Sequence, residues 1–183
     1  GEPARAHPSG GHHLCLDQAS QAPSLDTLGE FAAQVLDIVM TGWEAQAGGL
    51  FLYQDGTHTW TCRAARGLGE NLSSPQYALA LELVQQAHAQ ASPVIIPDLG
   101  GDGEHRLLSA AAAPLLSEGE TLGAIFLGAK RRRALNERHA ELLRTIAHQT
   151  ALAIRNAQLY NRLGQMAILE ERYRLSREIH DGL

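Results

Sequence analysis

The last quarter of the chain is the feature that most restricts how it can fold. From Asn136 to Leu183 there is no proline, and the only glycine before Gly182 is the isolated Gly164. Such a stretch favours one helix of about 48 residues, which at 1.5 Å per residue would be about 72 Å long. Because that length far exceeds one small domain, we expect much of the helix to pair with another helix.

Apolar residues recur along this stretch with the spacing of paired helices. A seven-residue repeat is typical of a coiled coil, so the sequence predicts a parallel homodimer held by this helix. The apolar positions are Leu142, Ile146, Ala153, Ala157 and Tyr160, then Leu159, Leu163, Met166 and Leu169, and in a shifted phase Leu175, Ile179 and Leu183. Glu170 and Arg174, four residues apart, are expected to form an exposed ion pair.

Composition is typical of one globular domain with an extension. The chain has 183 residues, of which 44% are hydrophobic. It contains no run of about 18 apolar residues that could span a membrane, and no secretory leader opens it. Because the first residue is Gly1 and not methionine, we expect a piece of a longer protein. We predict a cytoplasmic domain and leave open whether the parent protein is attached to a membrane.

Charge argues against a nucleic-acid-binding protein, and cysteine content argues against a small domain held together by disulfides. The net charge is −5, and the one basic cluster, residues 130–133, is typical of a solvated turn between a strand and a helix. Nucleic-acid binding is therefore not expected. Cys15 and Cys62 are the only cysteines, which provides no disulfide framework and fits a reducing compartment.

Residues 1–23 are interpreted as a flexible linker, because glycine, proline, serine and histidine dominate and no apolar period is present. The linker holds His7, His12, His13 and Cys15. No second ligand pair stands at a fixed offset to complete a tetrahedral site, so no metal is expected there.

Ordered elements are expected from residue 24 onward. The patterns predict a helix to about Trp43, a hairpin of strands 50–54 and 59–65 around Asp55-Gly56, a helix ending before Pro93, an edge strand at 93–98 and two strands around Glu118-Gly119. The last of these strands is apolar on both faces, as a central strand covered on both sides would be. Trp60, Cys62 and Ala64 are expected on one face of their strand, with Cys62 as a core thiol.

These elements occur in the order and with the short motifs of a GAF domain. The matching pieces are "ARG" at 65–67, "SPVIIPD", "SAAAAPLL", "TLGAIFLGAK" and "LLRTIAHQTALAIRNAQLY". Residues 24–160 therefore resemble the GAF family, preceded by the linker and followed at 161–183 by a signalling helix. The resemblance implies an α+β fold, with a central antiparallel sheet of about five or six strands, helices packed on one face and the long coiled-coil helix at the end.

A small-molecule pocket on the other face of the sheet is also implied by the resemblance. Its candidate residues are Trp60, Cys62, Tyr77, His88 and His105. Some haem-sensing GAF kinases carry an axial histidine shortly before the small-residue-then-proline motif, where His105 stands, so haem is one candidate cofactor and His88 an alternative ligand. A GAF domain that binds no ligand and serves as a dimerisation spacer is another interpretation.

The tail "ILEERYRLSREIHDGL" resembles the phosphoacceptor box of histidine kinases that signal to NarL-type response regulators. The resemblance implies that His180 accepts the phosphoryl group and that the adjacent Asp181 acts as base and orients the ring. Phosphoryl transfer to imidazole requires a neutral nitrogen, and a carboxylate can hold the opposite N–H and stabilise the imidazolium that forms. Glu178 is interpreted as surface charge.

The predicted function is therefore the sensor portion of a two-component histidine kinase, in which a signal in the GAF domain controls His180. No Gly-x-x-x-x-Gly-Lys motif and no ATP lid is present, nor a pair of Asp-x-Gly motifs that could build a kinase catalytic domain, so the chain alone should not use Mg-ATP. Free methionine sulfoxide reduction needs several cysteines near the pocket, and only Cys62 lies in the domain. The cyclic-nucleotide signature and a cysteine near His105 for bilin attachment are also missing.

Overall fold

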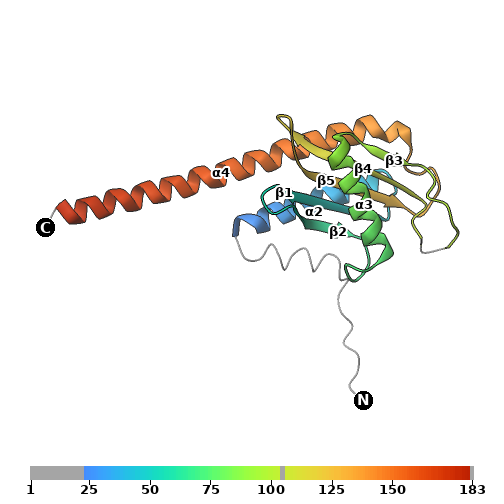
Figure 1. The fold of residues 1–183 in the computed structure, drawn as a ribbon, viewed down its shortest axis with the longest axis horizontal. Coiled ribbons are helices and arrows are strands. Elements are labelled where there is room, and N and C mark those ends of the chain that lie inside the picture. The colour runs from blue at the N-terminus through green and yellow to red at the C-terminus, as the bar shows by residue number, and fades with distance from the viewer. Residues whose placement is uncertain (1–22, 104–105, 182–183) are drawn as a thin grey trace, which may run out of the picture.

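The computed structural model describes residues 23–103 and 106–181 (Figure 1). The elements are α2 (Pro23–Gly42), β1 (Ala47–Gln54), β2 (Thr59–Arg66), α3 (Pro75–Gln90), β3 (Val94–Ile96), β4 (Ser109–Ser117), β5 (Glu120–Ala129), the 3₁₀ turn η1 (Glu137–His139) and α4 (Ala140–Asp181). The predicted hairpin, edge strand and final strand pair are all confirmed. The expected linker lies outside the described residues, apart from Pro23.

The five strands form one antiparallel sheet in the order β2-β1-β5-β4-β3. β5 lies at its centre, between β1 and β4, and its residues from Gly123 to Ala129 are buried. This burial explains why the strand is apolar on both faces. β3 has three residues and forms an edge, where the prolines on either side of it cost no ladder hydrogen bonds.

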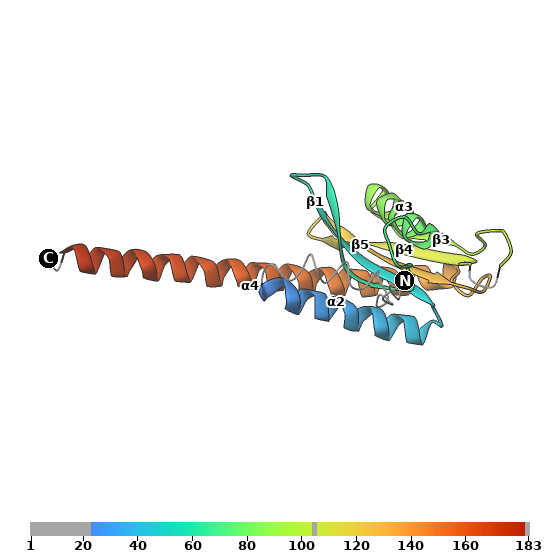
Figure 2. The same ribbon diagram turned by 90° about the horizontal axis from the view of Figure 1, so that it is seen from below.

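Helices cover both faces of the sheet (Figure 2). α2 and α4 pack together on one face, as expected, and α3 crosses the opposite face. The alanines of β4 alternate between the two layers: Ala111 and Ala113 contact the α2 and α4 side, and Ala110 and Ala112 contact the α3 side. Small side chains let helices approach a strand closely from both sides, so packing overrides the poor strand propensity of alanine.

A β-bulge in β2 corrects one expectation from strict alternation. Leu50 pairs with Ala64 and Phe51 pairs with Cys62, which leaves Arg63 as an extra residue. Ala64 therefore packs on the α2 side, while Cys62 packs on the α3 side, and the two do not share a face. Arg63 is buried, its Nε has no hydrogen-bond partner among the described residues, and desolvation lowers the pKa of its guanidinium.

α3 begins and ends where its local sequence dictates. The side chain of Ser74 accepts a hydrogen bond from the Tyr77 N–H at 3.1 Å, and Pro75 occupies the first turn. The helix stops at Ala91, whose φ of 52° is left-handed, just before Pro93. The end of this helix before Pro93 matches the prediction.

α4 is one continuous helix of 42 residues, about 63 Å long, and it extends far beyond the sheet (Figure 1). Its first half packs on the sheet through Leu143, Ala147, Ala151 and Ile154, all fully buried. From Leu159 onward its described side chains are exposed. No helix in the described part of the chain is both long and apolar enough to cross a membrane.

Candidate functional site

The face of the sheet under α3 was expected to hold the pocket, and most of it is filled by side chains. Cys62 and Tyr77 are buried there, and Phe51 packs edge-on against Tyr77 with ring centroids 5.8 Å apart. Burial raises the pKa of the Tyr77 hydroxyl. Cys62 is disulfide-bonded, which corrects the expectation of a core thiol. His105 lies outside the described residues.

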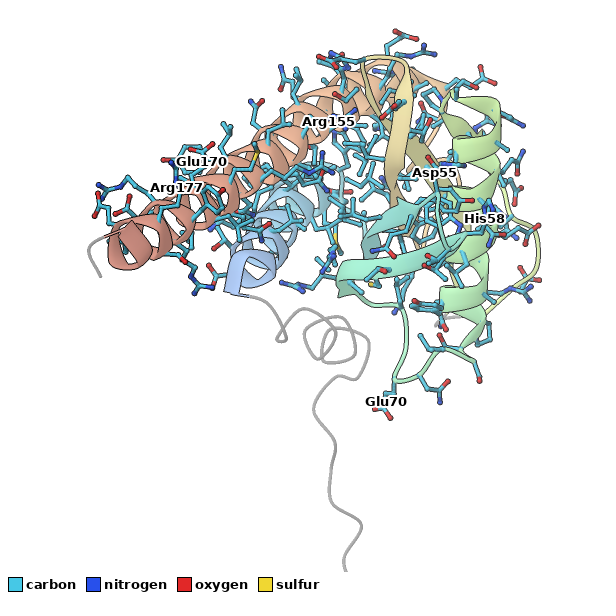
Figure 3. All side chains as sticks on the ribbon, turned by 60° about the vertical axis from the view of Figure 1, so that its left-hand side comes forward. Asp55, His58, Glu70, Arg155, Glu170 and Arg177 are labelled. Atoms are coloured by element: carbon cyan, nitrogen blue, oxygen red, sulfur yellow. The ribbon has the colours of Figure 1, made fainter. Side chains whose placement is uncertain are left out.

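Trp60 and His88 belong to an aromatic cluster that closes one end of this face. The Tyr53 ring lies 5.0 Å from Trp60 and 4.4 Å from His88, and Trp60 meets His88 edge-on at 5.2 Å. The Tyr53 hydroxyl is hydrogen-bonded to His58 Nδ1 at 2.8 Å. His58 and Asp55 lie at the exposed tip of the hairpin (Figure 3). The predicted residues therefore gather on the expected face, but Trp60 and His88 pack against neighbouring rings.

The cavity on this side lies instead at the start of α3. It measures about 220 Å³ and is lined by Pro75, Gln76 and Leu79 of α3 and by Leu99, Arg106 and Leu107 of the loop between β3 and β4. This volume is below the roughly 300–1,000 Å³ of pockets for drug-sized ligands, and a haem is larger still. Sequence reasoning missed all six residues, although the Gly-rich loop 99–106 beside a helix start was visible.

Charges fix the loop that forms one wall of this cavity. Asp98 accepts a hydrogen bond from the Gly100 N–H at 2.8 Å, and its Oδ1 lies 3.2 Å from Arg132 Nε. The same arginine reaches Asp102 at 3.4 Å. The basic cluster is therefore a turn after β5, as predicted, and one of its arginines holds a distant loop.

The pKa of Asp98 should lie below its ordinary value, chiefly because of the Gly100 N–H and then because of Arg132. A lowered folded-state pKa contributes stability that is present above the unfolded-state pKa and is lost as the pH falls through the folded-state pKa. Arg132→Gln should raise the Asp98 pKa toward the ordinary value in a carboxyl NMR titration. Arg131→Gln is the matched control, because Arg131 pairs with Glu44 instead. Equal titrations in both variants would contradict the assignment.

The solvent side of α4 carries a regular row of residues spaced three and four apart, which we call the α4 seam. It consists of Leu142, Thr145, Gln149, Leu152, Asn156, Leu159, Leu163 and Met166, followed by Glu170, Tyr173 and Arg177. Its leucines, Met166 and Tyr173 are 44–69% exposed. No charge interrupts the row before Glu170, which Figure 3 labels with Arg177 on the exposed half of the helix. Such a row is typical of a coiled-coil contact.

The seam leads toward the predicted phosphoacceptor. Residue 180 is the next position in the three-four spacing after Arg177, and the α4 backbone stays helical through Asp181. The side chains of Ile179, His180 and Asp181 lie outside the described residues, so the roles of His180 and Asp181 stay predictions. Leu175 stands nine residues after Met166, which at about 100° per residue places it on the opposite side of the helix.

One predicted ion pair on α4 is wrong. Arg174 contacts Glu171 at 2.6 Å and Glu178 at 3.0 Å, and not Glu170. Both acids lie one turn away on its own side of the helix, and the hydrogen bond to Glu171 raises the Arg174 pKa.

A five-stranded antiparallel sheet with its first and last helices on one face is the architecture that the sequence motifs had indicated. The other face is covered by α3, which was not expected there, and has a small cavity at the start of that helix. The GAF domain family model matches residues 26–155, more than half of the chain, so the chain belongs to the GAF domain family. No curated protein sequence matches the chain.

Several solved structures share this fold. The GAF domain of a phosphoenolpyruvate-protein phosphotransferase from Coxiella burnetii is 18% identical with a TM-score of 0.57, and the match covers 81% of this chain and 93% of that one. A domain assigned to a two-component sensor histidine kinase from Sinorhizobium meliloti is 19% identical with a TM-score of 0.53, covering 73% and 94%. The free methionine-R-sulfoxide reductase of Neisseria meningitidis, solved with its substrate, is 13% identical with a TM-score of 0.57, covering 80% and 87%. At these identities the likeness shows the fold alone.

Proposed function

We propose that this chain is the sensor portion of a two-component histidine kinase, in which the GAF domain controls phosphorylation of His180 through a dimeric α4. The observation that carries the proposal is the continuity of α4. The helix is buried against the sheet at Leu143 and Ile154 and continues without a break into the turn that holds "REIHD". The related fold in a sensor histidine kinase from Sinorhizobium meliloti adds support.

The proposed chemistry is transfer of the γ-phosphoryl group of Mg-ATP to the His180 ring. A ring nitrogen attacks phosphorus, an N–P bond forms, the P–O bond to the leaving ADP breaks, and the opposite ring N–H is held by Asp181. ATP would be bound by a catalytic domain of the parent protein, since this chain carries no nucleotide-binding motif. The phosphoryl group would then pass to the aspartate of a NarL-type response regulator.

The proposed dimer brings two copies of α4 side by side along the α4 seam. Leu159, Leu163 and Met166, which are consecutive positions of the seam, would otherwise expose an apolar stripe to water. A parallel arrangement places both copies of residue 180 at the same end of the pair. The sensor domains of the two copies then lie at the other end, where a ligand that favours one arrangement of the helices would bias phosphorylation.

Phosphorylation of the parent kinase tests the proposal. Incubation with Mg-ATP should place an acid-labile label on the protein, and His180→Gln should abolish it. His148→Gln is the matched control, because His148 is an exposed histidine on the same helix whose Nδ1 lies 3.1 Å from the Leu116 carbonyl oxygen. The chain alone should gain no label. Acid-labile label that persists in His180→Gln would overturn the assignment.

A ligand-free spacer is the second candidate, and the packing under α3 favours it. Phe51 and Phe126 are fully buried there, and the cavity beside Arg106 is small. A haem sensor is the alternative to a spacer. A visible spectrum of the protein mixed with hemin, repeated with His105→Ala, separates the two functions. A Soret band shifted from that of free hemin, and lost in His105→Ala, would support a haem sensor. If the parent chain and His105→Ala both give the spectrum of free hemin, haem sensing is excluded, and the domain either binds a smaller ligand or is a spacer.

A further inference from the structure

A second cavity lies beside the edge of the sheet, at the opposite end of α3 from the first. It measures about 290 Å³, close to the lower end of the range of small-molecule pockets. β3 pairs with β4 only from Ala110 to Ala112, so in the described part of the chain no strand flanks the later residues of β4 on this side. The apolar residues that line the space are Ala91, Pro93, Pro114 and Leu116.

α4 forms the polar wall of this cavity and contributes one arginine to it. The Arg144 side chain is half-exposed, and its Nε lies 3.6 Å from Glu141 Oε1, which is too far for a hydrogen bond. Within the described residues no hydrogen bond to Arg144 is formed. A guanidinium has five N–H donors in a planar fork that matches the two oxygens of a carboxylate. The cavity therefore combines an apolar lining with a cation whose donors are available.

The other two polar residues of the cavity, Thr145 and His148, already have hydrogen-bond partners. Thr145 Oγ1 donates to the Glu141 carbonyl oxygen at 3.0 Å, within α4. His148 Nδ1 lies 3.1 Å from the Leu116 carbonyl oxygen, and because a carbonyl oxygen can only accept, Nδ1 carries the proton. This bond holds the imidazole to β4, where the ring forms a wall of the cavity. Arg144 is therefore the group that is left to bind a ligand.

We infer that this cavity binds a small monocarboxylic acid, with its carboxylate on Arg144 and its apolar body against Pro93 and Pro114. The nearby Glu141 carboxylate favours one negative charge on the ligand, because it would repel a second one. The bound acid would connect α4 to β4 and to the link between α3 and β3. Its effect on signalling rests on the proposed function, since the acid would act on the packed half of α4, but binding itself requires neither the dimer nor His180.

Titration of the whole chain with benzoate, followed by amide NMR shifts, tests the inference. Benzoate joins one carboxylate to a flat apolar body of a size that suits the cavity. For a ligand of about nine non-hydrogen atoms we expect a dissociation constant of about 1 mM or lower. The largest shifts should occur at Leu116, Arg144 and Thr145, which line the cavity. Benzyl alcohol has the same ring without the charge and should bind at least about tenfold more weakly.

Arg144→Gln should raise the benzoate dissociation constant at least about tenfold. Arg162→Gln is the matched control, because Arg162 is an exposed arginine of the same helix outside the cavity, and it should leave the constant unchanged. Because both arginines are exposed, circular dichroism should be the same in all three proteins.

Three results would overturn the inference: no binding of benzoate up to about 10 mM, equal affinity in Arg144→Gln and the parent chain, or shifts confined to the first cavity, at Leu79, Leu99 and Leu107. None of them involves His180, so the proposed function would stand or fail separately, by the labelling experiment.

Discussion

Gly123→Ala should destabilise the fold by at least about 3 kcal/mol, a large part of the 5–15 kcal/mol that stabilises a typical domain. A Cβ at residue 123 would lie 1.9 Å from the Phe51 carbonyl oxygen and 2.9 Å from the Leu52 Cα. These are backbone atoms of the neighbouring strand, paired with β5 by the Leu52 and Gly123 register. They cannot rotate away as a side chain could, so β1 and β5 would have to separate at the centre of the sheet.

Gly164→Ala makes the matched comparison, because nothing lies within 4 Å of a Cβ built there and the residue sits inside α4. Alanine is favoured over glycine in a helix by about 1 kcal/mol, so this change should hold or raise the melting temperature. Thermal and urea unfolding of both variants measure the difference. A Gly123→Ala protein as stable as the parent would contradict the close strand approach.

Leu163→Glu should dissociate the proposed dimer, with the dissociation constant rising at least about a hundredfold. The change removes an apolar side chain from each copy, worth roughly 1.5–3 kcal/mol apiece when buried, and sets two carboxylates against each other across the two-fold axis. The side chain is 65% exposed in the single chain, so the GAF core should stay folded.

Light scattering against concentration measures this effect, and Ile168→Glu provides the control. Ile168 is 56% exposed but stands five residues from Leu163, which places it on the other side of α4. Its replacement should change dimerisation much less. Equal loss of the dimer in both variants would show that the helices do not pair along the seam.

Elements whose signals are local were predictable from the sequence. Three such signals affect only nearby residues: the Asp55-Gly56 turn, the prolines around β3 and the lack of proline from residue 136 onward. The hairpin, β3 and α4 occur where these signals predicted them. The bulge at Arg63 carries no such signal. It depends on how β2 pairs with β1, and it alone reverses the face on which Ala64 packs.

The candidate site was predictable only as a face of the sheet. Whether side chains under α3 leave a cavity depends on how closely the helix approaches Phe51 and Phe126, which lie on two different strands. The position of Leu99 depends on the Asp98 to Arg132 pair, which joins residues 34 apart in the chain. The ion-pair partner of Arg174 was predicted wrongly because three glutamates, at 170, 171 and 178, lie within about one helical turn of it. The side-chain rotamer of Arg174 determines which of them it contacts.

The first half of α4 is packed on the sheet, and the rest of the helix extends beyond it. The ratio of these two lengths determines how far the C-terminal end of α4 moves when the sheet moves. The helix is held over about 16 Å, from Leu143 to Ile154, and beside that base Arg155 is paired with Glu120 of β5 at 2.8 Å (Figure 3). From Arg155 to residue 180 the free arm is about 37 Å, more than twice the base. A tilt that shifts one end of the base by about 1 Å relative to the other therefore displaces residue 180 by about 2 Å. That displacement is comparable to the difference between a formed and a broken hydrogen bond.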